Sequence, residues 1–316
     1  YSLYQTASNL TSANSVEVAK FTLKDGGGVS DADGGSTLLN AISFSATNAS
    51  LIRRVALYDG IDWLAETAPS GSTFSFTGLN IVASDNGSKA FSLRVSFNTT
   101  VTDNQQFSFT VTSATAALSG SGFASSNASG AATSTAGDNN RLEVTATKIT
   151  YTTQPPSLIG VNTNVSPIPV LEARDVLNNK DLDYSSTVTL SNSASLTMAN
   201  GSTAFSSGAL TFPTNFQFIS YGTSTLTVAS GTLTSATSGT IVVRAAEPVA
   251  QPTGLTFNTI TANTMNGSFT AATGSPAGYL VVRKEVSAPI GLPADGSTYS
   301  VGDPTADGTV VHSGAT

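Results

Sequence analysis

Three aspartates near the start of the chain, Asp25, Asp31 and Asp33, could hold a calcium ion. They lie in a glycine-rich segment that can fold three carboxylates toward one point. Ca²⁺ takes about six to eight oxygen ligands, which carboxylates and turn carbonyls supply. The spacing lacks the closing Glu of an EF-hand, and a polar turn whose Asp side chains bond their own backbone fits the same residues. The sequence leaves a calcium site and a polar turn as the two interpretations.

A second acidic group consists of Asp175, Asp181 and Asp183, close to an expected junction between modules. The same two interpretations apply to it, and the calcium interpretation is the weaker one here. A calcium ion at a junction would stiffen a fibre by fixing the angle between neighbouring modules.

The only tryptophan, Trp63, follows a predicted strand and is flanked by Asp59, Asp62 and Glu66. An indole ring exposed beside Tyr58 could stack on a pyranose ring and so bind carbohydrate. The alternative is a core or rim aromatic, because tryptophan is largely buried in most proteins. Paired carboxylates for glycoside hydrolysis need a cleft between them, and we expect no catalysis at this position.

Other catalytic chemistry has few candidate residues. The single histidine, His312, stands beside Ser313, and the chain has no cysteine. A serine nucleophile needs a base in a defined structural context, and zinc needs paired His or Cys ligands. We therefore expect a protein that is not an enzyme and that has no certain cofactor, with Ca²⁺ as the one candidate.

Composition narrows the classes of partner. The formal net charge is −7 and only 10% of residues are charged, so no basic cluster exists to attract nucleic acid or an anionic membrane. No apolar run approaches the roughly 20 residues that span a bilayer. The chain begins with Tyr1 and ends with Thr316, and we expect it to be a portion of a longer protein.

Apolar and polar residues alternate with period 2 along the chain, which predicts half-buried β-strands. Turn signals such as Asp59-Gly60 separate these runs. A change of phase around Ala19 and Lys20 predicts a β-bulge. The sequence therefore predicts an all-β fold of tandem antiparallel β-sandwich modules. The clearest runs are Ile42, Phe44 and Ala46; Phe74 and Phe76; Phe91, Leu93, Val95 and Phe97; and Phe107, Phe109 and Val111.

Changes in repeat style divide the chain into a module over residues 1–147, an immunoglobulin-like module over 148–246, a proline-containing linker over 247–252 and a third module over 253–316. The Ala-, Ser- and Gly-rich segment 114–140 is expected to form a long loop before a final strand around Leu142–Ala146, or else a flexible linker. The third module is short for a complete sandwich. Either further chain or a neighbouring molecule would complete it.

Particular motifs in each module resemble known families. The second module resembles the bacterial immunoglobulin-like repeats of large surface proteins. The third is similar to fibronectin type III-like modules of secreted Bacteroidota proteins, and the first is similar to a module found beside these. The motifs are Thr153-Gln154-Pro155, 175–179 and Thr187-Val188-Thr189-Leu190 in the second module, 278–283, 293–296, 301–303 and 310–314 in the third, and 18–26 with the loop to Gly35 in the first.

The resemblance implies a large multidomain adhesin or surface filament, exported by the type IX secretion system and displayed outside a bacterial cell. It implies a structural or adhesive function through modular spacing, self-assembly and contact, with other copies of the chain or neighbouring modules as partners. The alternative is a set of carbohydrate-binding modules that serves a surface receptor or an enzyme, with surface glycans as partners.

Overall fold

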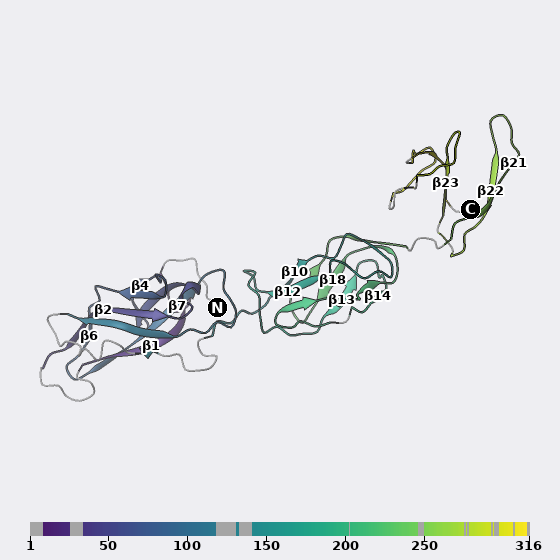
Figure 1. The fold of residues 1–316 in the computed structure, drawn as a ribbon. Coiled ribbons are helices and arrows are strands. Elements are labelled where there is room, and N and C mark those ends of the chain that lie inside the picture. The colour runs from purple at the N-terminus through teal and green to yellow at the C-terminus, as the bar shows by residue number, and fades with distance from the viewer. Residues whose placement is uncertain are drawn as a thin grey trace.

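The computed structural model describes residues 9–25, 34–117, 131–132, 141–201, 203–245, 250–274, 276, 278–291, 293, 297–305 and 307–314 (Figure 1). These residues form β-strands joined by turns and loops, with one short 3-10 turn at Ala49–Leu51 as the exception to the all-β architecture. The predicted all-β class is confirmed. No helix within the described ranges has the length and apolar character needed to cross a bilayer.

The first part of the chain folds into two sheets that face each other across one core (Figure 1). The alternation predicted from the sequence places Phe44, Phe74 and Phe109 in this core, where their rings contact one another. One sheet has the order β1-β7-β3-β4 and the other β5-β2-β8-β9, with β6 also paired to β2. The strands are β1 Val16–Lys24, β2 Thr37–Ala46, β3 Ile52–Asp59, β4 Asp62–Thr67, β5 Thr73–Phe76, β6 Ile81–Ala83, β7 Ser88–Phe97, β8 Phe109–Ala116 and β9 Ala131–Ala132.

The predicted bulge in the first strand is confirmed, slightly earlier than the sequence placed it. The register of β1 against β7 shifts between Glu17 and Ala19. Central strand β7 departs from the half-buried expectation, because Ser92 and Ser96 are buried along with the phenylalanines. The outer face of this sheet is therefore covered as well as its inner face.

The second part of the chain folds into smaller sheets around a separate core, which contains Leu171, Leu210 and Phe216. Its pairings are antiparallel except between β11 and β20, which run parallel, with Leu158 opposite Val242. The sheets are β10-β12-β15, β11-β20-β17, β13-β18-β19 and β14-β16. The strands are β10 Lys148–Thr153, β11 Leu158–Gly160, β12 Val170–Arg174, β13 Thr189–Asn192, β14 Met198–Ala199, β15 Ala209–Thr211, β16 Gln217–Phe218, β17 Gly222–Ser224, β18 Leu226–Ala229, β19 Ala236–Thr237 and β20 Ile241–Arg244.

The segment between the two cores is extended, but it is not the strand that the sequence predicts around Leu142–Ala146. Leu142 and Val144 pack in the first core, and Ala146 packs in the second. The amides of Val144 and Ala146 donate to the carboxylates of Asp103 and Asp181 rather than to a neighbouring strand. The predicted strand is therefore wrong in its hydrogen bonding, although its alternating burial is as expected.

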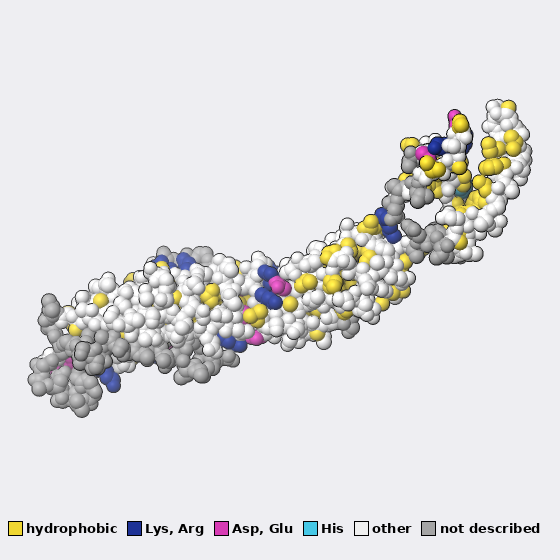
Figure 2. Space-filling view, viewed as in Figure 1, with side chains coloured by type: hydrophobic (Ala, Val, Ile, Leu, Met, Phe, Trp, Pro, Cys, Tyr) yellow, Lys and Arg dark blue, Asp and Glu magenta, His cyan; other side chains and the backbone are white. Residues whose placement is uncertain are grey.

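The third part of the chain forms two separate two-stranded arms, β21-β22 and β23-β24. All six residues of β21 are exposed, and Val310 is the one buried hydrophobic residue among those described after residue 250. Figure 2 shows hydrophobic side chains on the surface of these arms. The strands are β21 Thr253–Asn258, β22 Asn266–Thr270, β23 Tyr279–Arg283 and β24 Thr309–Gly314.

Candidate functional site

A short N-terminal segment, residues 9–15, lies across the outer face of the β1-β7-β3-β4 sheet, and we call it the strap. Its Leu10 is buried against Ala56 and Tyr58 of β3. The strap is held from both sides: the amide of Leu10 donates to Glu66 Oε2 at 2.6 Å, and the Tyr58 hydroxyl donates to the Leu10 carbonyl at 2.6 Å. Glu66 is in turn paired with Arg54.

Arg94 of central strand β7 anchors the other end of the strap. Its guanidinium donates to the hydroxyl and carbonyl of Ser15 at 3.0 and 2.8 Å, and to the carbonyl of Ser12 at 3.0 Å. The same guanidinium lies 5.8 Å from the centre of the Tyr58 ring. These contacts explain why the outer face of the sheet is covered, and they fix the strap in position.

A pocket of about 370 Å³ opens between the strap and the turn that joins β3 to β4. Its apolar lining comes from Leu10, Ile61 and Trp63, and its polar lining comes from Asn9, Thr11 and Ser12. Ile61 is 87% exposed and Trp63 is 48% exposed, so both present apolar surface to solvent beside the strap. This pocket is the candidate ligand site of the first sandwich.

The hairpin that carries Trp63 is a tight one. Asp59 pairs with Asp62, leaving Gly60 and Ile61 as the two turn residues. Gly60 has φ of 61°, as the first central position of a type II′ turn requires. The turn thus presents Ile61 at its tip and directs Trp63 to the face that carries the strap.

Both residues of the predicted carbohydrate platform line this pocket, in different roles. Trp63 is opposite Tyr58 in the register, so the two side chains share a face of the sheet. Tyr58 is only 2% exposed, because the strap covers its ring, and burial raises the pKa of its hydroxyl. Tyr58 therefore forms the floor of the pocket and not an exposed platform. The strap residues were not predicted, since nothing in their polar sequence indicates that they cross the sheet.

The acidic loop predicted to bind calcium is described at Asp25 alone, because Asp31 and Asp33 lie outside the described residues. Asp25 is buried, and its carboxylate accepts hydrogen bonds from the Thr37 hydroxyl at 2.5 Å and the Asn86 amide at 2.8 Å. These bonds tie the end of β1 to the start of β2 and to the β6–β7 turn. Within the described ranges no three His, Cys, Asp or Glu side chains are placed to share a metal ion, and the calcium site stays a prediction.

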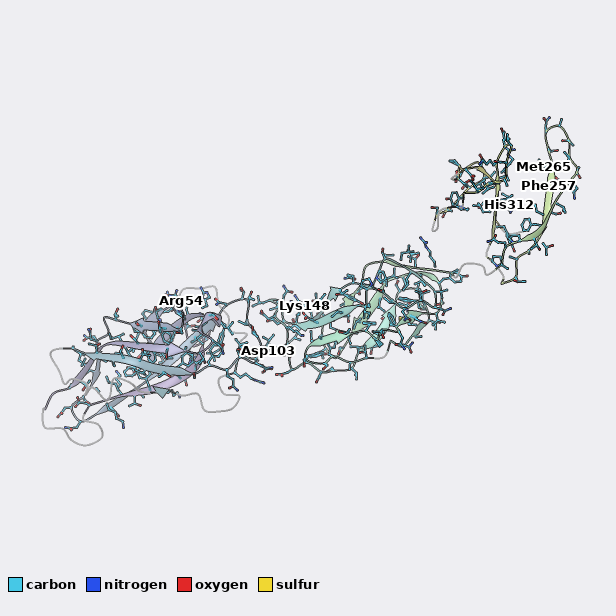
Figure 3. All side chains as sticks on the ribbon, in the orientation of Figure 1. Arg54, Asp103, Lys148, Phe257, Met265 and His312 are labelled. Carbon is cyan, nitrogen blue, oxygen red and sulfur yellow. The ribbon has the colours of Figure 1, made fainter. Side chains whose placement is uncertain are left out.

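A second constellation joins the two sandwiches, and we call it the joint. Asp103 lies on the β7–β8 connection of the first sandwich (Figure 3). Its Oδ1 accepts from the amide of Val144 at 2.7 Å, and its Oδ2 accepts from the amide of Leu182, in the second sandwich, at 2.7 Å. Asp103 is thus a buried carboxylate that binds backbone of both sandwiches.

Side chains of the second sandwich also make hydrogen bonds at the joint. Asn179 accepts from the Val101 amide at 2.9 Å and donates to the Thr99 carbonyl at 2.8 Å. Asp181 accepts from the amide of Ala146 at 2.9 Å. Charge-assisted bonds between a carboxylate and an amide are among the stronger hydrogen bonds in proteins, and each contributes about 1.5–3 kcal/mol.

The acidic group predicted at this junction is therefore located there, but its carboxylates bind amides. Asp175 accepts from the Asn179 amide at 2.8 Å, and Asp183 accepts from the Asn104 side chain at 3.0 Å. The sequence did not single out Asp103, and it marked Asn179 only as the last residue of the 175–179 motif. An Asp shortly after a predicted strand end was the available signal for the first of them.

The single histidine lies on β24, where His312 pairs with Val281 of β23. Figure 3 labels it on this arm, and labels Phe257 and Met265 on the β21-β22 arm. The two arms meet where the rings of Phe269 and Tyr279 lie 4.9 Å apart.

Comparisons with known proteins give distant likenesses only. No family model matches the chain, and no curated protein matches it. Among solved structures, a glycosyl hydrolase family 2 member from Bacteroides cellulosilyticus is 13% identical over 61% of this chain and 22% of its own, with a TM-score of 0.27. A β-glycosidase from Bacteroides vulgatus is 8% identical over 71% and 24%, with a TM-score of 0.24.

A third structure, the BSP domain of a biofilm associated protein, is 12% identical over 94% of this chain and 57% of that one, with a TM-score of 0.27. The chain therefore spans less than two thirds of the length of each of these proteins. Likenesses with TM-scores this low carry no argument about function. The resemblance to secreted Bacteroidota surface proteins stays a prediction.

Proposed function

We propose that this chain is a structural segment of an extracellular bacterial surface protein, in which the first two sandwiches form one stiff spacer. The observation that carries the proposal is the joint. Asp103 and Asn179 bind backbone groups across the boundary, and residues 141–147 pass from one core directly into the other. A spacer works by holding a distance, and buried charge-assisted bonds between two domains limit their relative motion.

The composition supports the same role. A surface with few charges and no cysteine suits a protein that must persist outside the cell without disulfides. The proposal assigns no catalytic step to the chain. It also assigns the ends of the spacer, rather than its middle, to contact with other molecules.

A distance measurement between the sandwiches tests the spacer. Because the chain has no cysteine, Thr77→Cys and Thr240→Cys, both at exposed positions, can carry spin labels without background. We expect one narrow distance distribution by double electron–electron resonance. Asp103→Asn puts an NH₂ group where an amide now donates, and we expect it to broaden the distribution.

The matched control is Asp85→Asn, an exposed carboxylate of the same sandwich away from the joint. It should leave the distribution unchanged. A broad distribution in the wild-type protein, or one that Asp103→Asn does not alter, would contradict a stiff spacer.

The third part of the chain favours a contact role, which we propose is pairing with a further copy of the chain. Leu255, Phe257, Ile260 and Met265 are all more than half exposed. A two-stranded arm also leaves strand edges unpaired, and an added strand would cover them. Sedimentation velocity over a wide concentration range should show association that Phe257→Ser with Met265→Ser weakens. A single monomer boundary at every concentration would refute it.

A further inference from the structure

The pocket between the strap and the β3–β4 turn has the features of a small-molecule site in a protein that otherwise has the properties of a spacer. Ligand pockets are concave, mostly apolar and lined by a few well-placed polar groups. Here Trp63, Ile61 and Leu10 supply the apolar walls, and Asn9, Thr11 and Ser12 supply the polar ones. The volume of about 370 Å³ lies at the lower end of the range for such pockets.

The backbone on both sides of this open pocket is held in place by the fold itself. The strap is hydrogen-bonded to Tyr58, Glu66 and Arg94, and the Trp63 hairpin is a two-residue turn paired through Tyr58. A preformed site loses little conformational entropy when it binds. The half-exposed indole has thus been left uncovered by the folded sheet, and it faces a concave space.

The polar groups of the strap divide into two sets. Main-chain groups are already engaged: the Leu10 amide and carbonyl, the Thr11 amide and the Ser12 carbonyl all have partners. In contrast, the side-chain hydroxyls of Thr11 and Ser12 and the side-chain amide of Asn9 make no hydrogen bond to the residues that the structure describes. These three groups can both donate and accept, so they suit a ligand that carries hydroxyls.

Charge decides between classes of ligand. None of the side chains that line the pocket is ionised at neutral pH. The ionised groups beneath it are paired with each other or with the strap: Glu66 with Arg54 and the Leu10 amide, and Arg94 with Ser12 and Ser15. An acidic or basic ligand would find no counter-charge in this pocket.

We propose that this pocket binds one neutral hexose unit of a polysaccharide. The C–H face of the pyranose ring lies against the indole of Trp63, with Ile61 at its edge. The ring hydroxyls bond with Asn9, Thr11 and Ser12. A pyranose combines an apolar face with a rim of hydroxyls, and this pocket combines an aromatic wall with hydroxyl and amide groups. The inference is independent of the spacer proposal, since it uses neither the joint nor the third part of the chain.

The intrinsic fluorescence of the wild-type protein tests this directly, because Trp63 is the only tryptophan in the chain. Cellohexaose, maltohexaose, mannohexaose and chitohexaose (the N-acetylated form) are the neutral probes, and oligogalacturonate is the acidic one. We expect a saturable change with at least one neutral probe, confirmed by isothermal titration calorimetry, and none with oligogalacturonate. No saturable binding of any neutral probe by calorimetry would overturn the proposal, as would equal binding of the acidic one.

Substitutions then locate the binding. Trp63→Ala should weaken affinity by about tenfold or more, as the loss of roughly 1.4 kcal/mol of aromatic stacking requires. Thr11→Val, which keeps the shape and removes the hydroxyl, should weaken it by about three- to tenfold through one lost hydrogen bond. The control is Tyr221→Ala, another exposed aromatic residue, in the second sandwich, which should bind as the wild type does.

Thermal unfolding of each variant separates lost binding from lost folding. If Trp63→Ala does not fold, Trp63→Leu, which keeps an apolar side chain without an aromatic ring, and Thr11→Val carry the test. Wild-type affinity in the folded variants would overturn the proposal. So would a concentration-dependent dimer that Trp63→Ala abolishes, because the exposed indole would then be a protein contact.

Discussion

The first two sandwiches and the third part of the chain are built from the same kind of strand, yet they differ in how completely the strands are covered. In the second sandwich Phe216, just before β16, is 1% exposed, whereas in the third part Phe257, on β21, is 54% exposed. Alternation produces strands in both regions, but a core forms only where a second sheet covers the apolar face. Strand formation and core formation are therefore separate properties of this sequence.

The largest expected effect comes from truncating these two phenylalanines. Phe216→Ala removes a ring packed against Phe212 and Phe218, at 4.9 and 5.5 Å between ring centres, and should cost about 3–5 kcal/mol of unfolding free energy. Phe257→Ala should change the free energy by about 0.5 kcal/mol or less, because most of its ring is already in water. Urea denaturation measures both. Equal costs would mean that the third part has a closed core in solution.

The second-largest expected effect concerns two glycines of the second sandwich, one of which lies against a residue of the joint. Gly208 has φ of 68°, and a Cβ there would lie 1.8 Å from the carbonyl oxygen of Asp181. Gly208→Ala should therefore destabilise the second sandwich by about 1–3 kcal/mol and disturb the turn that presents Asp181 to the joint. Gly239→Ala is the matched control, since a Cβ at Gly239 meets nothing within 4 Å. If both variants unfold at the same urea concentration, the close approach at Gly208 is not rigid.

The smallest expected effect concerns Asp307 in the third part of the chain. Its carboxylate accepts hydrogen bonds from backbone amides, as the carboxylate of Asp103 does in the joint. The Asp307 carboxylate accepts from the amides of Ile290 and Gly291 at 2.9 and 3.1 Å and pairs with Lys284 at 3.0 Å. The Ile290 amide, followed by Lys284, lowers the pKa of Asp307 below its usual value. A lowered folded-state pKa means that the contribution to stability is present above the unfolded-state pKa. It is lost as the pH falls through the folded-state value.

Carboxyl ¹³C chemical shifts measured across an acid titration should therefore show Asp307 protonating at lower pH than an Asp in an unfolded peptide. Lys284→Met should raise its pKa only part of the way, because the Ile290 amide remains. An Asp307 that titrates like the unfolded peptide would mean that the loop does not hold its amides in place.

The sequence predicted strand positions well because burial of one face gives a signal that needs no partner to be known. Phe44, Phe74 and Phe91 are all buried as their alternation indicates, and the β1 bulge follows from a phase change. Prediction from the sequence failed where a segment distant in the chain determines burial or hydrogen bonding. Ser92 and Ser96 are buried on the outer face of the sheet, opposite Tyr58 and Arg54 of β3, and the amides of Val144 and Ala146 donate to Asp103 and Asp181.

The same limit applies to the candidate site. Tyr58 and Trp63 could be linked from sequence because a short hairpin places them opposite each other. The polar half of the pocket comes from the strap, 48 positions before Tyr58. No local pattern in Asn9, Thr11 or Ser12 indicates where that segment will lie. The strap is positioned by its hydrogen bonds to Arg94 and Glu66, which are distant in the sequence and come close to it only in the folded sheet.

The parallel pairing of β11 with β20 has a consequence for how the second sandwich carries tension. β11 lies toward the N-terminal end of this sandwich and β20 lies at its C-terminal end, with Leu158, Ile159 and Gly160 opposite Val242, Val243 and Arg244. When the chain is pulled from both ends, β11 is drawn backward and β20 forward along their common direction. The hydrogen bonds between them are then sheared together, whereas in a hairpin pulled open from its free ends they would break one at a time.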